Sequence, residues 1–144
     1  MILYIFNPLA KSSDRLKSKI KSCLVEFGLI GEFVEVVNKE DIRKIVADAI
    51  ERKVEKIVAI GGDGMINRIV PHILNTNIPL GIIPTGETNF LANILGIKDW
   101  KKGCTTLTKG RVIELNVGMA NDHYFLSSIE IDGKQDEKKL RSEM

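Results

Sequence analysis

A glycine-rich turn that carries one carboxylate is the segment of this sequence best suited to chemistry. Gly61, Gly62 and Gly64 surround Asp63, directly after an apolar run. Three glycines within four positions allow backbone N–H groups to approach a ligand closely. A helix that begins here would add a dipole favourable to phosphate. The segment lacks the Gly-Lys-Ser/Thr of a Walker A loop and the spacing of a dinucleotide fingerprint, so it indicates a phosphate-binding turn of another type.

Asp63 is the unusual member of this turn. A carboxylate about 4 Å from a phosphate charge costs on the order of 4 kcal/mol at an effective dielectric near 20. It belongs beside phosphate only if a cation such as Mg²⁺ bridges the two groups, or if it binds a sugar hydroxyl. The alternative interpretation is structural, with Asp63 capping the helix that runs from Gly64 onward. Both interpretations remain open at this stage.

Two further segments stop predicted strands where a ligand would be expected. Asn7-Pro8 ends the apolar run from Ile2 to Phe6, and Pro84-Thr85-Gly86 ends the run from Leu80 to Ile83. In an open α/β sheet, ligands bind beyond the carboxyl ends of the strands, where backbone amides and helix N-termini converge. The sequence therefore predicts that both segments lie at the same edge of the sheet as the glycine turn.

Short apolar runs alternate with stretches of helical periodicity, which predicts βαβ units and a largely parallel sheet. Strands are predicted at residues 2–6, 33–37, 56–60 and 80–83. Helices are predicted at residues 16–27, 42–50, 66–74 and 87–95, and from Asp99 to near Gly110. Gly28 is placed to end the first helix in a left-handed conformation, and Asn38 with Asp41 forms a capping pair for the second.

The last third of the chain changes character. Residues 112–117 and 124–131 are predicted as strands around an Asn121-Asp122 turn, so the sheet is expected to turn antiparallel there. The expected fold is a three-layer, Rossmann-like α/β domain. Its mostly parallel sheet is flanked by helices and ends in an antiparallel hairpin, and a second, β-rich domain is absent.

Composition narrows the classes of partner. The chain has 144 residues, of which 44% are hydrophobic and 28% charged, with a net charge of +2. This charge is too small to favour nucleic acid. Two cysteines without close spacing are typical of free thiols in a reducing cytosol, and no apolar run approaches the ~20 residues of a membrane span. We therefore expect a cytoplasmic protein, with peripheral membrane contact left open.

Four segments, in order along the chain, resemble the diacylglycerol kinase catalytic domain family. Val58 to Asn67 is similar to its Gly-Gly-Asp-Gly-Thr signature, which NAD kinases and phosphofructokinases share in variant form. Ile5 to Pro8 is similar to the family's Asn-Pro-x-Ser-Gly strand end. Gly81 to Asn89, continued by Leu95-Gly96-Ile97, is similar to its Pro-x-Gly-Thr-x-Asn segment. Asp122 to Leu126 resembles the hairpin that leads into a second domain.

The resemblance defines a nucleotide-binding domain over residues 1–132 and leaves residues 133–144 as a charged tail. It implies binding of ATP and Mg²⁺ and phosphorylation of a lipid hydroxyl in a cleft with a second, β-rich domain. It assigns no catalytic residue to this chain and makes Asp63 the candidate Mg²⁺ contact, through phosphate. The nucleotide contacts that it implies by position are Asn7, Asn38, Gly61, Gly62, Asp63, Gly64, Asn67, Gly86, Glu87 and Asn89.

Several of the implied contact positions depart from the family pattern. The departing residues are Ala10-Lys11, Met65, Arg68, Glu87 and Phe90. Glu87 replaces a threonine at the start of a predicted helix, where a carboxylate would compete with phosphate for the same amides. The hypothesis is that Glu87 weakens ATP binding unless a metal, Lys11 or Arg68 compensates.

Two other functions stay open on the sequence. An NAD kinase would usually carry an Asn-Glu pair downstream of the glycine turn, whereas Asn89 here precedes Phe90. A degenerate, non-catalytic module for nucleotide binding or oligomerisation is favoured by Met65, Arg68 and Glu87. A homo-oligomer is compatible with either interpretation. The lipid-kinase interpretation leads, with activity expected to be weak or absent without the second domain.

Overall fold

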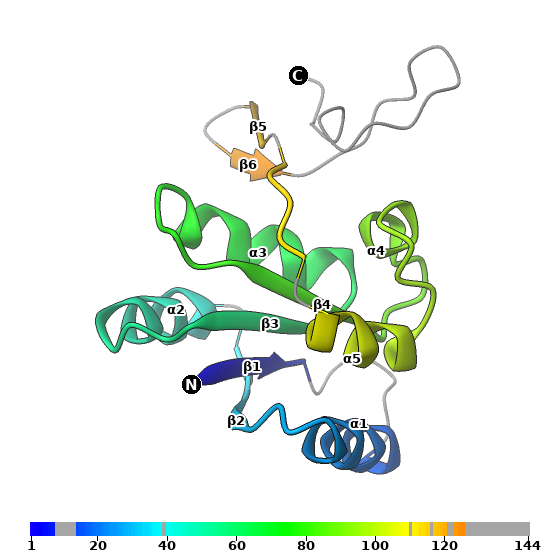
Figure 1. Cartoon of the computed structure of the whole chain (residues 1–144). Coiled ribbons are helices and arrows are strands. Elements are labelled where there is room, and N and C mark those ends of the chain that lie inside the picture. The colour runs from blue at the N-terminus through cyan, green and yellow to red at the C-terminus, as the bar shows by residue number, and fades with distance from the viewer. Residues whose placement is uncertain (8–13, 39, 110, 116, 121–122, 126–144) are drawn as a thin grey trace.

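The computed structural model describes residues 1–7, 14–38, 40–109, 111–115, 117–120 and 123–125 (Figure 1). Its centre is a four-stranded sheet in the order β2-β1-β3-β4. The strands are β1 (Ile2–Phe6), β2 (Gly31–Glu35), β3 (Lys56–Gly61) and β4 (Leu80–Pro84). All three pairings are parallel, so the carboxyl ends of the four strands lie at one edge, as the sequence predicts.

Two apolar cores cover the two faces of this sheet. Every residue of β1 is buried, which explains its uninterrupted apolar sequence. Leu3 and Ile5 belong to the core on one face, and Tyr4 and Phe6 to the core on the other. Burial raises the pKa of Tyr4 to about 12, so its hydroxyl stays protonated and donates to the carbonyl oxygen of Leu29 at 2.7 Å.

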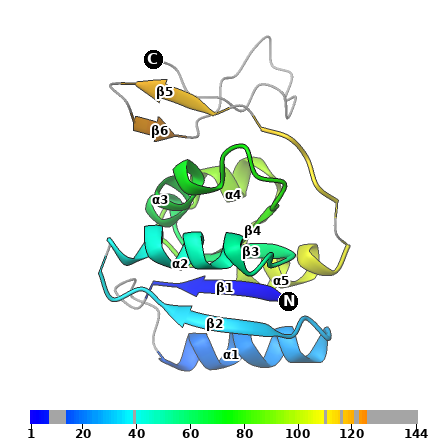
Figure 2. The same ribbon diagram turned by 90° about the vertical axis from the view of Figure 1, so that its left-hand side faces the viewer.

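Helices form the outer layers (Figures 1 and 2). The residues of α1 (Asp14–Glu26) and α5 (Trp100–Lys109) pack into the core around Tyr4. Those of α2 (Asp41–Glu51), α3 (Asp63–Ile73) and the short α4 (Phe90–Ile94) pack into the core around Leu3. Figure 1 shows α1 below the sheet and α3 above it. The predicted three-layer α/β architecture with a mostly parallel sheet is therefore confirmed.

Local signals explain several helix ends. Gly28, two residues after α1, has a φ of +70°, which favours glycine. The Asp41 carboxylate accepts a hydrogen bond from the Asn38 N–H at 3.2 Å, as expected of the capping pair. The Asp99 carboxylate accepts one from the Lys102 N–H at 2.8 Å at the start of α5. In the part of the chain that the structure describes, no helix has the length and apolar character to cross a bilayer.

Three predicted elements are shifted or wrong. β2 begins and ends two residues earlier than the predicted 33–37. α4 begins at Phe90, not at Glu87. Residues 111–115 and 117 form no strand. Their apolar side chains line a groove beside β4 instead of pairing in the sheet, while Val112 is 64% exposed.

Beyond that segment, the structure describes two short strands. β5 (Gly118–Ala120) pairs antiparallel with β6 (His123–Phe125), and β6 lies beside α3. The predicted turn at residues 121–122, most of the predicted strand at 124–131 and the tail at 133–144 lie outside the described residues. So do Pro8 and the Ala10-Lys11 pair.

Candidate functional site

Three strand ends meet at the carboxyl edge of the sheet. The Asn7 N–H donates to the carbonyl of Ile60 at 3.4 Å, and the Thr85 N–H donates to the carbonyl of Gly61 at 3.0 Å. The end of β3 therefore lies between the ends of β1 and β4. We name residues 61–64 the β3 turn and residues 85–89 the β4 loop. The structure brings together the three segments that the sequence placed at this edge.

The β3 turn and the β4 loop touch through two glycines. A Cβ atom built on Gly86 would lie 2.7 Å from the Gly62 Cα and 3.3 Å from the Gly62 nitrogen. A Cβ atom on Gly62 would lie 3.2 Å from the Gly86 Cα. These distances are shorter than side chains tolerate against backbone, so the glycines permit a contact that other residues would push apart.

Asn89 fixes the shape of the β4 loop. Its side-chain oxygen accepts a hydrogen bond from the Gly86 N–H at 2.9 Å, and its amide nitrogen donates to the Gly86 carbonyl at 2.8 Å. Its backbone is left-handed, with φ +45°, a conformation that asparagine tolerates better than most residues. The side chain implied by the resemblance as a nucleotide contact thus has both polar ends bonded within its own loop.

Asp63 joins the β3 turn to the start of α4. One carboxylate oxygen accepts hydrogen bonds from the Thr88 hydroxyl at 3.0 Å and the Phe90 N–H at 2.8 Å. The other oxygen accepts one from the Leu91 N–H at 3.1 Å. The structural interpretation of Asp63 needs correction: α3 has Gly62 as its N-cap with no side-chain cap, and Asp63 caps α4 instead.

The placement of Glu87 also differs from the prediction. Glu87 is exposed in the β4 loop, three residues before α4. The first amides of α4 are already bonded to Asp63. Glu87 therefore does not lie at the start of α4, because the predicted helix start was wrong. Its predicted effect on phosphate stays a prediction, for which its charge gives a physical reason.

The remaining predicted contacts are spread over the same edge and α3. Gly64 is exposed in the first turn of α3, and a Cβ atom built on it would meet nothing within 4 Å. Asn67 lies one turn further along α3 and is half-buried, and Asn7 follows β1. Asn38 is exposed three residues after β2, where its N–H is bonded to Asp41. Within the described part of the chain, no hydrogen bond joins Asn38 to either glycine segment.

Two threonines of the β4 loop were missed by the sequence analysis. Thr88 donates to Asp63, and the Thr85 hydroxyl is buried without a hydrogen-bond partner among the described residues. Both flank Gly86 and Glu87 within the segment from Gly81 to Asn89 that resembles the family pattern. Their position in that segment could have indicated that they belong to the site. A buried hydroxyl without a partner is costly, so Thr85 is a polar group at this edge whose hydrogen bonding the described residues leave unsatisfied.

The described side chains near the glycine segments do not form a metal site by themselves. Among the described residues, no group of three or more His, Cys, Asp or Glu side chains is arranged to hold a metal ion. Asp63 already accepts three hydrogen bonds. The residues present therefore fit Mg²⁺ only as an ion that arrives with phosphate oxygens.

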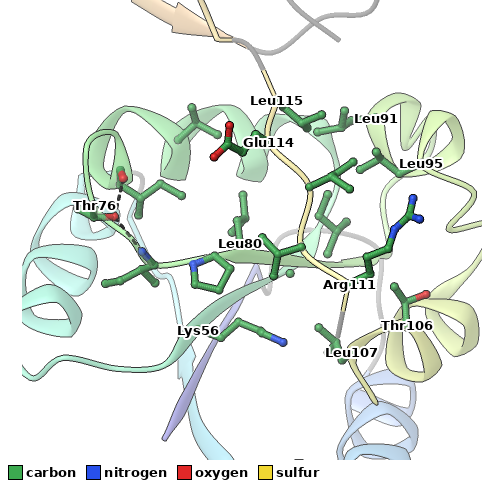
Figure 3. A pocket seen from close by; sticks show the side chains of 18 of the residues that line it. Lys56, Thr76, Leu80, Leu91, Leu95, Thr106, Leu107, Arg111, Glu114 and Leu115 are labelled. Carbon is green, nitrogen blue, oxygen red and sulfur yellow. Dashed lines mark hydrogen bonds between the residues drawn. The ribbon is translucent and has the colours of Figure 1, made fainter. Parts of the chain in front are cut away.

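A hollow lies away from these segments, along the outer edge of β4 (Figure 3). This groove has a volume of about 810 Å³ and is lined mainly by apolar residues of β4, the helices α3 to α5 and residues 111–115 and 117. Lys56, Arg111 and Glu114 are its charged members. No residue of the β3 turn or the β4 loop lines it, so this groove and the glycine segments are separate features.

Known proteins resemble this chain over most of its length. The family model described as the diacylglycerol kinase catalytic domain matches residues 1–120. A diacylglycerol kinase of Bacillus subtilis (strain 168) is 35% identical over 91 residues, which cover 60% of this chain and 30% of that protein. An uncharacterized protein of Synechocystis sp. is 32% identical over 134 residues, covering 82% of this chain and 30% of that protein.

A solved structure agrees with these sequence matches. A diacylglycerol kinase from Bacillus anthracis str. Sterne superposes with a TM-score of 0.75 and 26% sequence identity. The superposition covers 88% of this chain and 44% of that chain. This chain therefore spans less than half the length of each of these three relatives.

Proposed function

Because this chain belongs to the diacylglycerol kinase catalytic domain family, we propose that it is the ATP-binding domain of a lipid kinase. The nucleotide phosphates would lie at the β3 turn and the β4 loop. The γ-phosphate would pass to a hydroxyl group of a lipid. Since the chain spans less than half of its relatives, we expect the acceptor to need groups from a second domain, and activity of residues 1–144 alone to be weak.

The contact between Gly62 and Gly86 is the observation that carries this proposal. It places two glycine segments from neighbouring parallel strands side by side, at the edge where α/β sheets bind ligands. Met65 and Ile66 are bonded through their N–H groups to the Gly62 carbonyl, whereas helix geometry gives the Asp63 and Gly64 amides before them no carbonyl one turn earlier. Gly64 leaves open space beside them. Free amides, a helix dipole and room for a ligand are what a phosphate chain requires.

Mg²⁺ would be held chiefly by the phosphates of ATP, with Asp63 near but occupied by its own hydrogen bonds. When bound, the ion would neutralise charge on the transferring phosphoryl group. The residues of this chain would then have the task of orienting the phosphates. Phosphoryl transfer depends mainly on such positioning and on charge neutralisation, so a site built from backbone amides is suited to it.

A lipid acceptor implies work at a membrane surface, and one face of the chain fits such contact. Arg15, Lys19 and Lys101 line a groove between α1 and α5, together with Phe27 and Trp100. Cationic side chains beside aromatic ones suit the interface of an anionic bilayer. We place the protein in the cytoplasm, in peripheral contact with that surface. Cys23 and Cys104 are free thiols, in keeping with a reducing compartment.

Calorimetry with Mg-ATP on the natural protein and on Glu87→Thr tests the nucleotide site. Glu87 carries a charge of the same sign as phosphate on the β4 loop, so its removal should tighten binding. At an exposed position the gain is about 1 kcal/mol, roughly fivefold in affinity. Glu51→Thr is the matched control, because Glu51 is exposed at the far end of α2 and its loss changes net charge equally.

The expected ranking is Glu87→Thr tighter than the natural protein, with Glu51→Thr unchanged. Equal affinity of all three proteins would remove Glu87 from the site. If neither the natural protein nor Glu87→Thr binds Mg-ATP at millimolar concentration, the proposed function is wrong for this chain.

A further inference from the structure

We propose that Asp63 is a positioning residue that clamps the β4 loop against the β3 turn, instead of a direct ligand of the metal. The hydrogen bonds of Asp63 are observed in the structure and do not depend on the proposed function. Their consequence for nucleotide binding rests on the proposed function. The carboxylate at the centre of the signature would thus act on phosphate through the backbone that it holds.

The hydrogen bonds of Asp63 leave little acceptor capacity for a cation. A carboxylate offers about four acceptor positions on its two oxygens. Thr88 and Phe90 occupy one oxygen, and Leu91 occupies the other. Two of the three donors are backbone N–H groups at 2.8 and 3.1 Å, and hydrogen bonds to an ionised acceptor are among the stronger ones. One position stays open on the oxygen that Leu91 bonds, so a metal bound there would have to share that oxygen with the Leu91 N–H.

The helix that Asp63 caps cannot cap itself. α4 has only five residues, and its N-cap residue Asn89 makes no side-chain capping bond. The Asn89 side chain is instead bonded to Gly86 at both of its polar ends. A helix this short is unstable alone, and its first N–H groups need acceptors. Asp63, which lies 27 residues before Phe90 in the chain, supplies them from another element.

Asp63 and the glycine contact therefore act on the same loop from two sides. Gly86 rests on Gly62 at the beginning of the loop, and Asp63 holds Thr88 and Phe90 at its end. Asn89 connects these two points. If the Asp63 bonds are lost, the end of the loop is released and Gly86 is no longer held against the β3 turn. Both segments that would surround the phosphates then lose their fixed spacing.

Amide hydrogen exchange on the ligand-free protein tests the clamp directly. In Asp63→Asn we expect the Phe90 and Leu91 amides to exchange at least tenfold faster, because an amide side chain replaces one acceptor oxygen by a donor. Thr88→Val removes one donor and keeps the charge, so a smaller acceleration is expected. Asp41→Asn is the matched control, since the Asp41 carboxylate accepts a bond at the start of a different helix. Unchanged exchange at Phe90 and Leu91 in Asp63→Asn would overturn the proposal.

Nucleotide binding then separates positioning from metal ligation. The affinity of Asp63→Asn for ADP is measured twice, once with Mg²⁺ and once in EDTA. A positioning role predicts a loss by the same factor, about tenfold, in both conditions, and a weaker parallel loss in Thr88→Val. A loss confined to the Mg²⁺ condition would make Asp63 a metal ligand and overturn the proposal.

The two measurements also separate this inference from the proposed function. If the natural protein binds no nucleotide, the proposed function fails. The exchange of Phe90 and Leu91 still decides whether Asp63 clamps the loop. Thr88→Val keeps the carboxylate, so it reports on the clamp even if Asp63→Asn does not fold.

Discussion

Two regions of the molecule adjoin β4: the pair of glycine segments at its carboxyl end and the apolar groove along its outer edge. The groove has a volume of about 810 Å³ and is lined mainly by aliphatic side chains (Figure 3). The glycine segments differ from the groove in chemistry. They contain backbone groups and short polar side chains whose partners are fixed by hydrogen bonds.

The two regions therefore differ in the kind of contact that they offer a ligand. An aliphatic lining offers non-directional contacts, and it accepts any apolar surface of suitable shape. The glycine segments offer directed N–H groups beside a helix N-terminus, which select charge and geometry. We therefore place the phosphates at the glycine segments. Three substitutions test this contrast, and they follow in order of decreasing effect on stability.

Gly86→Ala should have the largest effect. A Cβ atom at this position would lie 2.7 Å from the Gly62 Cα and 3.0 Å from the Asn89 side-chain oxygen. Backbone cannot yield as a flexible side chain does, so the two loops must separate. Overpacking of this kind costs about 2 kcal/mol, which urea unfolding would measure as a lower midpoint with an unchanged slope. Nucleotide affinity should fall as well, because the spacing of the two segments changes.

Gly96→Ala serves as a reference of a different kind. Gly96 has a φ of +81° and nothing within 4 Å of its Cβ position, so its cost is strain in the backbone alone, about 1 kcal/mol. It should leave nucleotide affinity intact. A Gly86→Ala protein as stable as the natural one would mean that the Gly62–Gly86 contact is absent in solution.

The outline of the fold could be predicted from the sequence, because its signals are local. The apolar runs at β1, β3 and β4 and the periodicity of α1 to α3 depend on neighbours within a few residues. The start of α4 could not be found in the same way. It depends on Asp63, which lies 27 residues before Phe90 in the chain. Because α4 has no capping side chain of its own, the local sequence does not indicate where this helix begins.

The same distinction explains what was missed in the site. The glycines of the β3 turn and the β4 loop were recognisable, because both segments resemble a known signature. That they touch each other depends on the register of β3 and β4, in which Gly61 pairs with Pro84. Similarly, residues 112–117 alternate as a strand would, yet residues 112–115 and 117 line a groove, because edge pairing is decided by tertiary contacts.

In the groove, Leu80→Ala should have an intermediate effect. Leu80 is half-buried and lines the apolar hollow, so part of its side chain is already outside the core. Loss of the remaining contacts should cost about 1 kcal/mol. Mg-ATP affinity should not change, since the residue is remote from both glycine segments. A drop in affinity comparable to that of Gly86→Ala would show that the two regions are coupled, and it would break the comparison.

Gly64→Ala should have the smallest effect on stability and the opposite sign. Gly64 lies in the first turn of α3, its φ is outside the left-handed region, and a methyl group there would meet nothing within 4 Å. Alanine at such a position stabilises by about 0.5 kcal/mol, because it restricts the unfolded chain. The open space that makes the substitution harmless to folding is the space assigned to phosphate. Mg-ATP affinity should therefore fall while the urea midpoint rises. A stabilised protein with full affinity would contradict that assignment, and would move the phosphates away from the start of α3.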